Sequence, residues 1–176
     1  MRVLLKFTID CDPDAAWRAV HSPRALAELY RPLVDLEPLD VGGLPTSWSP
    51  GGEVAVALSL GGVIPLGRQF IHVSDIETAD THGRVRIFRD SGIPLSGPLA
   101  GLDVWDHQMA ISAAPGEPGR TLWRDRLTIG GAVAPVVWPV LWSLWQWRAA
   151  RIRALSPGWA HDPELSAEEP PSAREP

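Results

Sequence analysis

Cysteine is almost absent from this sequence, because Cys11 is the only one among 176 residues. A single cysteine excludes an intramolecular disulfide and any metal site built on paired cysteines. Residues 1–10 have too short an apolar stretch for a signal peptide, and no cleavage site of small residues follows them. A reducing compartment suits such a chain, so we expect a cytoplasmic protein.

The chain also lacks an excess of positive charge. The formal net charge is -5, and most of it comes from residues 157–176, which hold five acidic residues against one arginine. The rest of the chain is therefore close to neutral and lacks the basic field that nucleic-acid binding requires. The histidines are not spaced as metal ligands. We expect no nucleic-acid partner, no metal site and no cofactor.

The first thirty residues predict one strand and two short helices. Residues 2–10 are rich in Val, Leu, Phe and Ile, as strands are. Asp12 and Ser22 are each followed by proline, which is typical of a capping residue and the first position of a helix. The two helices should end near Val20 and Tyr30, and a stretch rich in Pro and Gly follows them to Gly52.

The middle of the chain alternates apolar and polar residues with a period of two, which predicts antiparallel strands. The clearest segments are 53–60, 68–78, 84–90, 102–112 and 121–129. A long helix should then cover residues 134–155. We expect one α+β domain over residues 1–156, with the helix packed on one face of the sheet, and a disordered acidic, Pro-rich tail over residues 157–176.

This order of elements resembles the helix-grip fold of the START-like, or Bet v 1-like (SRPBCC), superfamily. The local sequences that carry the resemblance are IDCDPDAAWRAVHSP, RDSGIPLSGP, WDHQMAI, RTLWRDRLTI and WQWRAARIRAL, and they look like the polyketide cyclase/dehydrase-type branch. The resemblance covers residues 1–155. It implies a curved antiparallel sheet of six to seven strands wrapped around the C-terminal helix, usually with a hollow between them. The superfamily includes carriers, lipid-transfer proteins, receptors and enzymes, so its fold does not select an activity.

The segment PVVWPVLWSLWQW, residues 135–147, allows three interpretations. The apolar run 129–147 is nearly long enough to cross a bilayer, but Pro135 and Pro139 interrupt it. We favour a helix that closes a cavity, with its tryptophan stripe toward the sheet and its arginines in solvent. That stripe consists of Trp138, Trp142 and Trp145.

The third interpretation is peripheral contact with a membrane, and it is compatible with the second. Trp147 lies on the side of the helix opposite the stripe, and Arg148 and Arg151 follow it. Tryptophan together with arginine suits a membrane surface. Delivery of an apolar ligand would connect the two interpretations.

Two ionisable residues interrupt the apolar faces of the last two strands. His107 alternates with Trp105 and Met109, and Asp125 alternates with Trp123. A turn centred on Gly116 would place His107 opposite Asp125, and a register shift of two residues would leave the pair diagonal and still within reach. Because a buried carboxylate needs a partner, we predict a contact between these two side chains inside the sheet.

The role of this pair stays open between a structural contact, a polar anchor for a ligand, and acid–base catalysis by His107 oriented by Asp125. We favour binding of a small apolar ligand between the sheet and the helix, with transport of that ligand as a further role. The alternatives are an enzyme of the cyclase/dehydratase kind and a partner-binding module with a filled core. The candidate ligand-binding residues are Trp105, His107, Met109, Trp123, Asp125, Trp138, Trp142 and Trp145.

Overall fold

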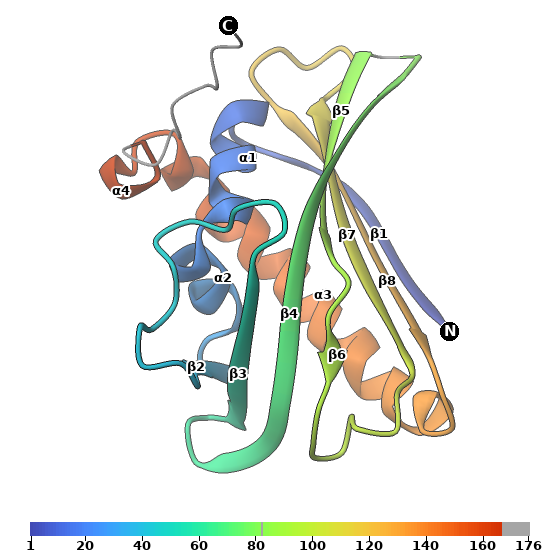
Figure 1. Cartoon of the computed structure of the whole chain (residues 1–176). Coiled ribbons are helices and arrows are strands. Elements are labelled where there is room, and N and C mark those ends of the chain that lie inside the picture. Colours follow the sequence, from blue (N-terminus) through green and yellow to red (C-terminus); the bar gives the residue numbers. More distant parts are fainter. Residues whose placement is uncertain (82, 167–176) are drawn as a thin grey trace, which may run out of the picture.

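The computed structural model describes residues 1–81 and 83–166 and confirms the predicted order of elements. The chain begins with β1 (Arg2–Ile9), α1 (Pro13–His21) and α2 (Pro23–Tyr30) (Figure 1). The Asp12 carboxylate accepts hydrogen bonds from the first turn of α1, and the Ser22 hydroxyl accepts one from the first turn of α2. These caps satisfy backbone N–H groups that a helix cannot bond internally.

The strands form one antiparallel eight-stranded sheet with the order β1-β8-β7-β5-β4-β3-β2, and β6 pairs with β4. The sequence predicted six to seven strands and missed the two shortest, β2 and β6, because both lie among turn-forming residues. The remaining strands are β2 (Val34–Pro38), β3 (Glu53–Leu60), β4 (Ile64–Asp80), β5 (Gly83–Asp90), β6 (Ile93–Pro94), β7 (Val104–Ala113) and β8 (Thr121–Gly130).

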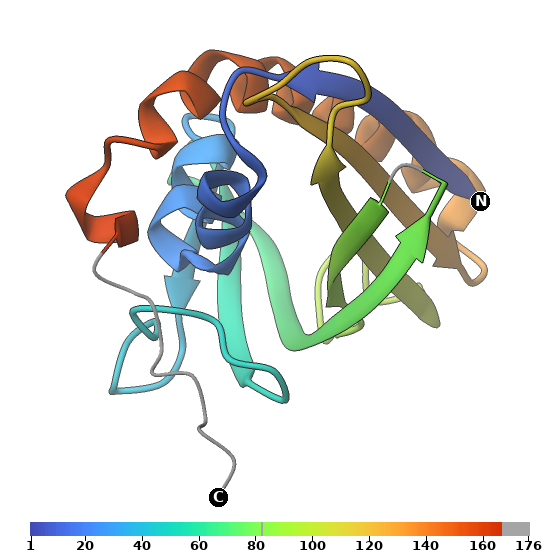
Figure 2. The ribbon, with the colours of Figure 1, turned by 90° about the horizontal axis from the view of Figure 1, so that it is seen from above.

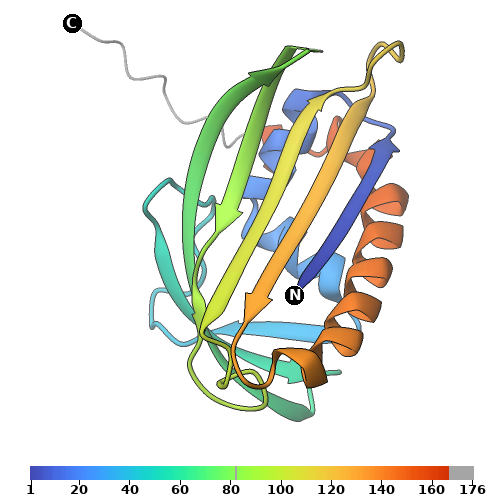
Figure 3. The same cartoon turned by 90° about the vertical axis from the view of Figure 1, so that its right-hand side faces the viewer.

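The long helix α3 (Ala134–Trp159) runs beside β1 (Figure 3). The sheet is strongly curved, and Figure 2 shows α1 and α2 next to α3 at its open side. The curved sheet and α3 together form the helix-grip arrangement that the sequence predicted. Among the helices of residues 1–81 and 83–166, none combines the length and apolar character needed to cross a bilayer.

The C-terminal boundary differs from the expected one. The helix α3 continues past residue 156 to Trp159, and a short α4 (Pro163–Ser166) follows it. Trp159 is buried against Trp123, with ring centroids 6.0 Å apart, and Leu165 is buried as well. Tertiary contacts therefore order a segment whose composition predicted a tail. The rest of the predicted tail, residues 167–176, lies outside the described residues.

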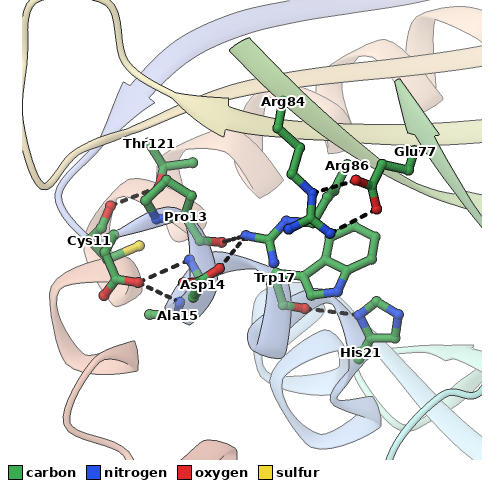
Figure 4. Close-up of polar contacts among 11 residues, drawn as sticks. Cys11, Pro13, Asp14, Ala15, Trp17, His21, Glu77, Arg84, Arg86 and Thr121 are labelled. Atoms are coloured by element: carbon green, nitrogen blue, oxygen red, sulfur yellow. Dashed lines mark hydrogen bonds and ion pairs between the residues drawn. The ribbon is translucent and has the colours of Figure 1, made fainter. Parts of the chain in front are cut away.

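Polar contacts attach α1 to the sheet (Figure 4). The Arg86 guanidinium on β5 donates to the Pro13 carbonyl oxygen at 2.8 Å and to the Asp14 carboxylate at 2.7 Å. At the start of α1, the Thr121 hydroxyl donates to the Cys11 carbonyl oxygen at 2.8 Å. Burial raises the pKa of the Cys11 thiol to about 12, so this cysteine stays protonated and unreactive.

Candidate functional site

A cavity of about 590 Å³ is lined by the concave face of the sheet together with α2 and α3. Its walls are mostly aliphatic and aromatic side chains. A few polar side chains reach it as well, from α2, β4, β5, β7 and α3: Tyr30, Gln69, Asp90, His107 and Ser143. A large apolar cavity with a few polar groups is the usual form of a small-molecule site.

Half of the predicted ligand-binding residues line this cavity. They are Trp105, His107 and Met109 on β7 and Trp145 on α3. Asp125 does not line it, but it contacts His107 directly: the His107 Nε2 atom lies 2.9 Å from Asp125 Oδ1. The predicted contact between these two residues is thus confirmed.

The register that produces this contact differs from the prediction. Asp125 lies opposite Met109, and His107 lies opposite Leu127, so the His107–Asp125 contact is diagonal. The shift arises in the loop between β7 and β8. The Ala114 backbone N–H bonds to the Arg120 carbonyl oxygen at 3.0 Å, which centres the loop one residue beyond the predicted Gly116.

The Asp125 carboxylate is only 2% exposed and accepts hydrogen bonds from several donors. In addition to His107, the Trp145 indole N–H donates to Oδ1 at 2.8 Å, and the Arg148 guanidinium forms an ion pair with Oδ2. Burial alone would raise the pKa of Asp125, but the Arg148 charge and these hydrogen bonds outweigh it and hold that pKa far below its ordinary value. Asp125 is therefore an anion inside the protein.

Arg148 corrects the predicted placement of the arginines in solvent. Its side chain is 1% exposed, so it cannot take part in the peripheral membrane contact predicted for it. Arg148 follows Trp145 by three residues, which places the two on one face of α3. The buried carboxylate predicted at Asp125 needed a cation, but the chain holds 16 lysines and arginines and nothing in the sequence singled out Arg148.

Three predicted wall residues do not line the cavity. Trp142 is 46% exposed, and Leu141 is buried in its place. Trp138 is half-buried, and its indole N–H donates to the Arg2 carbonyl oxygen at 3.1 Å. Trp123 is fully buried in the core, stacked on Phe7 with ring centroids 6.5 Å apart. The first half of α3 is apolar on all sides, so helical periodicity could not distinguish its inner face from its outer face.

Asp90 is a site residue that the sequence analysis missed. It is the direct register partner of His107 across β5 and β7, and it lines the cavity. Its carboxylate accepts hydrogen bonds from the Trp105 indole N–H at 3.1 Å and from the Gly92 backbone N–H at 3.0 Å. Burial away from bulk solvent raises its pKa. Asp90 ends its strand in the sequence, and nothing local to it predicts that it faces inward.

Gln69 and Tyr30 were missed too. The Gln69 side chain is 7% exposed and lines the cavity from β4. Its alternation with Ile71 and Val73 is a signal in the sequence that could have identified it. Tyr30 lines the cavity from α2, and its ring centroid lies 5.8 Å from the Arg148 guanidinium. Burial raises the pKa of Tyr30 to about 12, so its hydroxyl remains protonated.

Comparison with known proteins shows similarity at the level of the fold. No family model matches the sequence, and no curated protein matches it. A solved protein from Chromobacterium violaceum is 16% identical over 89% of this chain and 98% of its own, with a TM-score of 0.57. Norcoclaurine synthase from Thalictrum flavum, in complex with dopamine and hydroxybenzaldehyde, is 13% identical over 88% of this chain and 85% of its own, with a TM-score of 0.54. The chain has the Bet v 1-like helix-grip fold.

The Aha1 dimer from Colwellia psychrerythraea also shares the helix-grip fold. It is 9% identical over 89% of this chain and 96% of its own, with a TM-score of 0.54. A shared fold does not establish a function, so the function has to be argued from the residues of the cavity.

Proposed function

We propose that this protein binds, and can carry, a small and largely apolar ligand in the cytoplasm, within the cavity between the sheet and α3. The observation that carries the proposal is the cavity itself, whose volume of about 590 Å³ and apolar walls suit a small organic molecule. Norcoclaurine synthase, which has the same fold, is solved with two aromatic molecules, dopamine and hydroxybenzaldehyde. A filled core, one of the alternatives from the sequence, does not agree with such a cavity.

The β3–β4 turn and the N-terminal part of α3 lie at the same end of the molecule (Figure 1). Leu60, Val136 and Val140 line the cavity there and are 43%, 77% and 70% exposed. Apolar side chains that are both exposed and part of the cavity wall mark where an apolar ligand can enter. Contact of Trp147 and Arg151 with a membrane surface stays a prediction, and Trp147 is 37% exposed.

The binding proposal is tested with the purified protein. Native mass spectrometry before and after organic extraction should show an apolar molecule that co-purifies. Nile red, a neutral dye whose emission depends on polarity, should bind the extracted protein and shift its emission to the blue. An unliganded mass before extraction, together with no Nile red binding, would contradict the proposal.

A second candidate function is proton transfer to and from a carbon next to a carbonyl group, as in the cyclase/dehydratase reactions that the sequence resemblance implies. The observation that favours it is the position of His107, which lies between the buried Asp125 anion and the cavity. A carboxylate behind an imidazole orients the ring and stabilises its protonated form, which is what a general base requires.

We expect the protein to accelerate exchange of the α-hydrogens of 2-tetralone with deuterium oxide, followed by NMR. His107→Gln should slow this exchange by a factor of about 100 or more, since a positioned base contributes that much. Free imidazole at the same concentration provides the reference rate. Exchange that is no faster than this reference, or that His107→Gln leaves unchanged, would rule out the catalytic candidate.

A further inference from the structure

Among the described residues, the cavity wall offers a ligand anion no counter-charge. Asp90 is an acidic residue in the wall, and no lysine or arginine of residues 1–81 and 83–166 lines the cavity. The nearby Arg148 is already paired with Asp125. A ligand carboxylate or phosphate would lose its hydration without gaining a counter-charge, and it would also meet Asp90 in a medium of low polarity. The cavity therefore disfavours anionic ligands.

The His107 ring offers an acceptor at one end of the cavity. Asp125 is an anion and can only accept hydrogen bonds, so the Nε2 atom of His107 must donate to it. In a neutral ring, Nδ1 is then left as an acceptor. Within the part of the chain that the structure describes, Nδ1 has no hydrogen-bond partner, and the residue lines the cavity. A ligand hydroxyl is the complementary group.

Asp90 adds to the preference for hydroxyl groups at the His107 end of the cavity. It faces the cavity beside His107 because the two residues are register partners on β5 and β7. A hydroxyl that donates to His107 can also interact with the Asp90 carboxyl group. An ionised Asp90 would instead repel a second carboxylate placed at the same position. One residue thus favours hydroxyl groups and rejects anions.

Gln69 provides a second polar position. Its side chain is 7% exposed and lines the cavity, and no side-chain hydrogen bond joins it to another residue in the described part of the chain. An amide that faces an apolar cavity can pair with a polar group of a bound ligand. Gln69 lies on β4, whereas Asp90 and His107 lie on β5 and β7, so the two polar positions are on different strands of the cavity wall.

We propose that the ligand is a neutral, elongated apolar molecule with a hydroxyl group at one end and a carbonyl or hydroxyl group at the other. The first group binds between His107 and Asp90, and the second binds the Gln69 amide. Fatty-acid carboxylates and phosphorylated lipids are rejected. This inference rests on the proposed binding function and specifies its ligand class.

The test uses four naphthalenes of similar size, measured by isothermal titration calorimetry at pH 6.5. The compound 6-hydroxy-2-acetylnaphthalene carries both polar groups. In 6-methoxy-2-acetylnaphthalene the hydroxyl donor is blocked, 2-naphthol lacks the carbonyl, and 6-hydroxy-2-naphthoate carries a carboxylate. We expect the first compound to bind about tenfold more tightly than the methyl ether and than 2-naphthol, because each loses one buried hydrogen bond. The naphthoate should bind at least about tenfold more weakly than the first compound.

Two variants assign the affinity differences among the naphthalenes to individual residues. Gln69→Leu keeps the size of the side chain and removes the amide, so it should abolish the preference for the acetyl compound over 2-naphthol while retaining the preference for hydroxyl over methoxy. Asp90→Asn keeps the shape and removes the ionisable carboxyl group, so it should reduce the rejection of the naphthoate. Nile red binding by each variant shows that the cavity is still formed.

The outcomes separate this inference from the proposed function. If neither Nile red nor any naphthalene binds, the binding function itself is wrong, and this inference falls with it. If all four naphthalenes bind with equal affinity, or the naphthoate binds most tightly, the binding function stands and the inferred ligand class is wrong.

Discussion

Asp125→Asn should lower the free energy of unfolding by about 3–5 kcal/mol, because it leaves the Arg148 charge buried without a partner. Both side chains of this ion pair are 1% exposed. The substitution also weakens the hydrogen bonds that the carboxylate accepts from His107 and from the Trp145 indole. Urea unfolding at pH 7, followed by circular dichroism, measures the effect.

Asp106→Asn is the matched control. Asp106 forms an ion pair with Arg89 at 2.6 Å, but the two side chains are 19% and 38% exposed. Because solvent screens such a pair, the control should lose less than about 1 kcal/mol. Replacing both buried charges together, as in Asp125→Leu with Arg148→Met, should restore part of the lost stability. Equal losses in Asp125→Asn and Asp106→Asn would contradict this account of the buried pair.

The Asp125–Arg148 ion pair also predicts how the destabilisation by Asp125→Asn depends on pH. The pKa of Asp125 is lower in the folded protein than in the unfolded chain. The contribution of Asp125 to the free energy of unfolding is therefore fully present above its ordinary pKa of about 4. This contribution is lost as the pH falls through the lower pKa of the folded protein. The stability difference between the wild type and Asp125→Asn should be constant from pH 7 to about 5 and should shrink below about 4. Asp90, whose pKa is raised, changes the stability with pH in the opposite direction. It is present in both proteins, so the difference between them still reports on Asp125.

Filling the cavity should remove ligand binding without unfolding the protein. Leu58 on β3 and Leu66 on β4 are half-buried and line the cavity. Replacing both with tryptophan places two large rings in space that an apolar ligand would occupy. We expect the affinity for Nile red to fall by at least about thirtyfold, which corresponds to roughly 2 kcal/mol of lost apolar burial.

The melting temperature of this double variant should stay the same or rise, because new apolar contacts replace the cavity surface. Leu4→Trp is the control: Leu4 is 66% exposed on β1 and does not line the cavity, so it adds an aromatic ring elsewhere. This control should bind Nile red as the wild type does. Wild-type affinity in the cavity-filling variant would show that the dye binds outside the cavity.

The order of elements could be predicted because it depends on local chemistry. Asp12 and Ser22 cap their helices through hydrogen bonds to backbone atoms two or three residues away. The alternation of β7 and β8 identifies their inner faces, because side chains of a strand point to opposite sides in turn. The same alternation placed His107 and Asp125 inside, and the short turn between the two strands placed them close together. These predictions needed no information from distant parts of the chain.

The composition of the site depended on contacts between distant segments. Arg148 is buried because its partner Asp125 lies on a strand 23 residues earlier in the chain. Asp90 belongs to the site because β5 pairs with β7 in a register that places it beside His107. Composition and periodicity describe a segment by itself and carry no information about which distant segment will face it.

The sequence by itself determined the fold class, the two capped helices and the pair of ionisable residues on the inner face of the sheet. Each of these follows from residues that are neighbours in the chain or alternate along one strand. Only the tertiary structure decided which side of α3 faces inward, because that helix is apolar around its first half and has no polar face to orient it. The packing of α3 against β1 made that choice. It turned Trp145 and Arg148 toward Asp125 and left Trp142 in solvent.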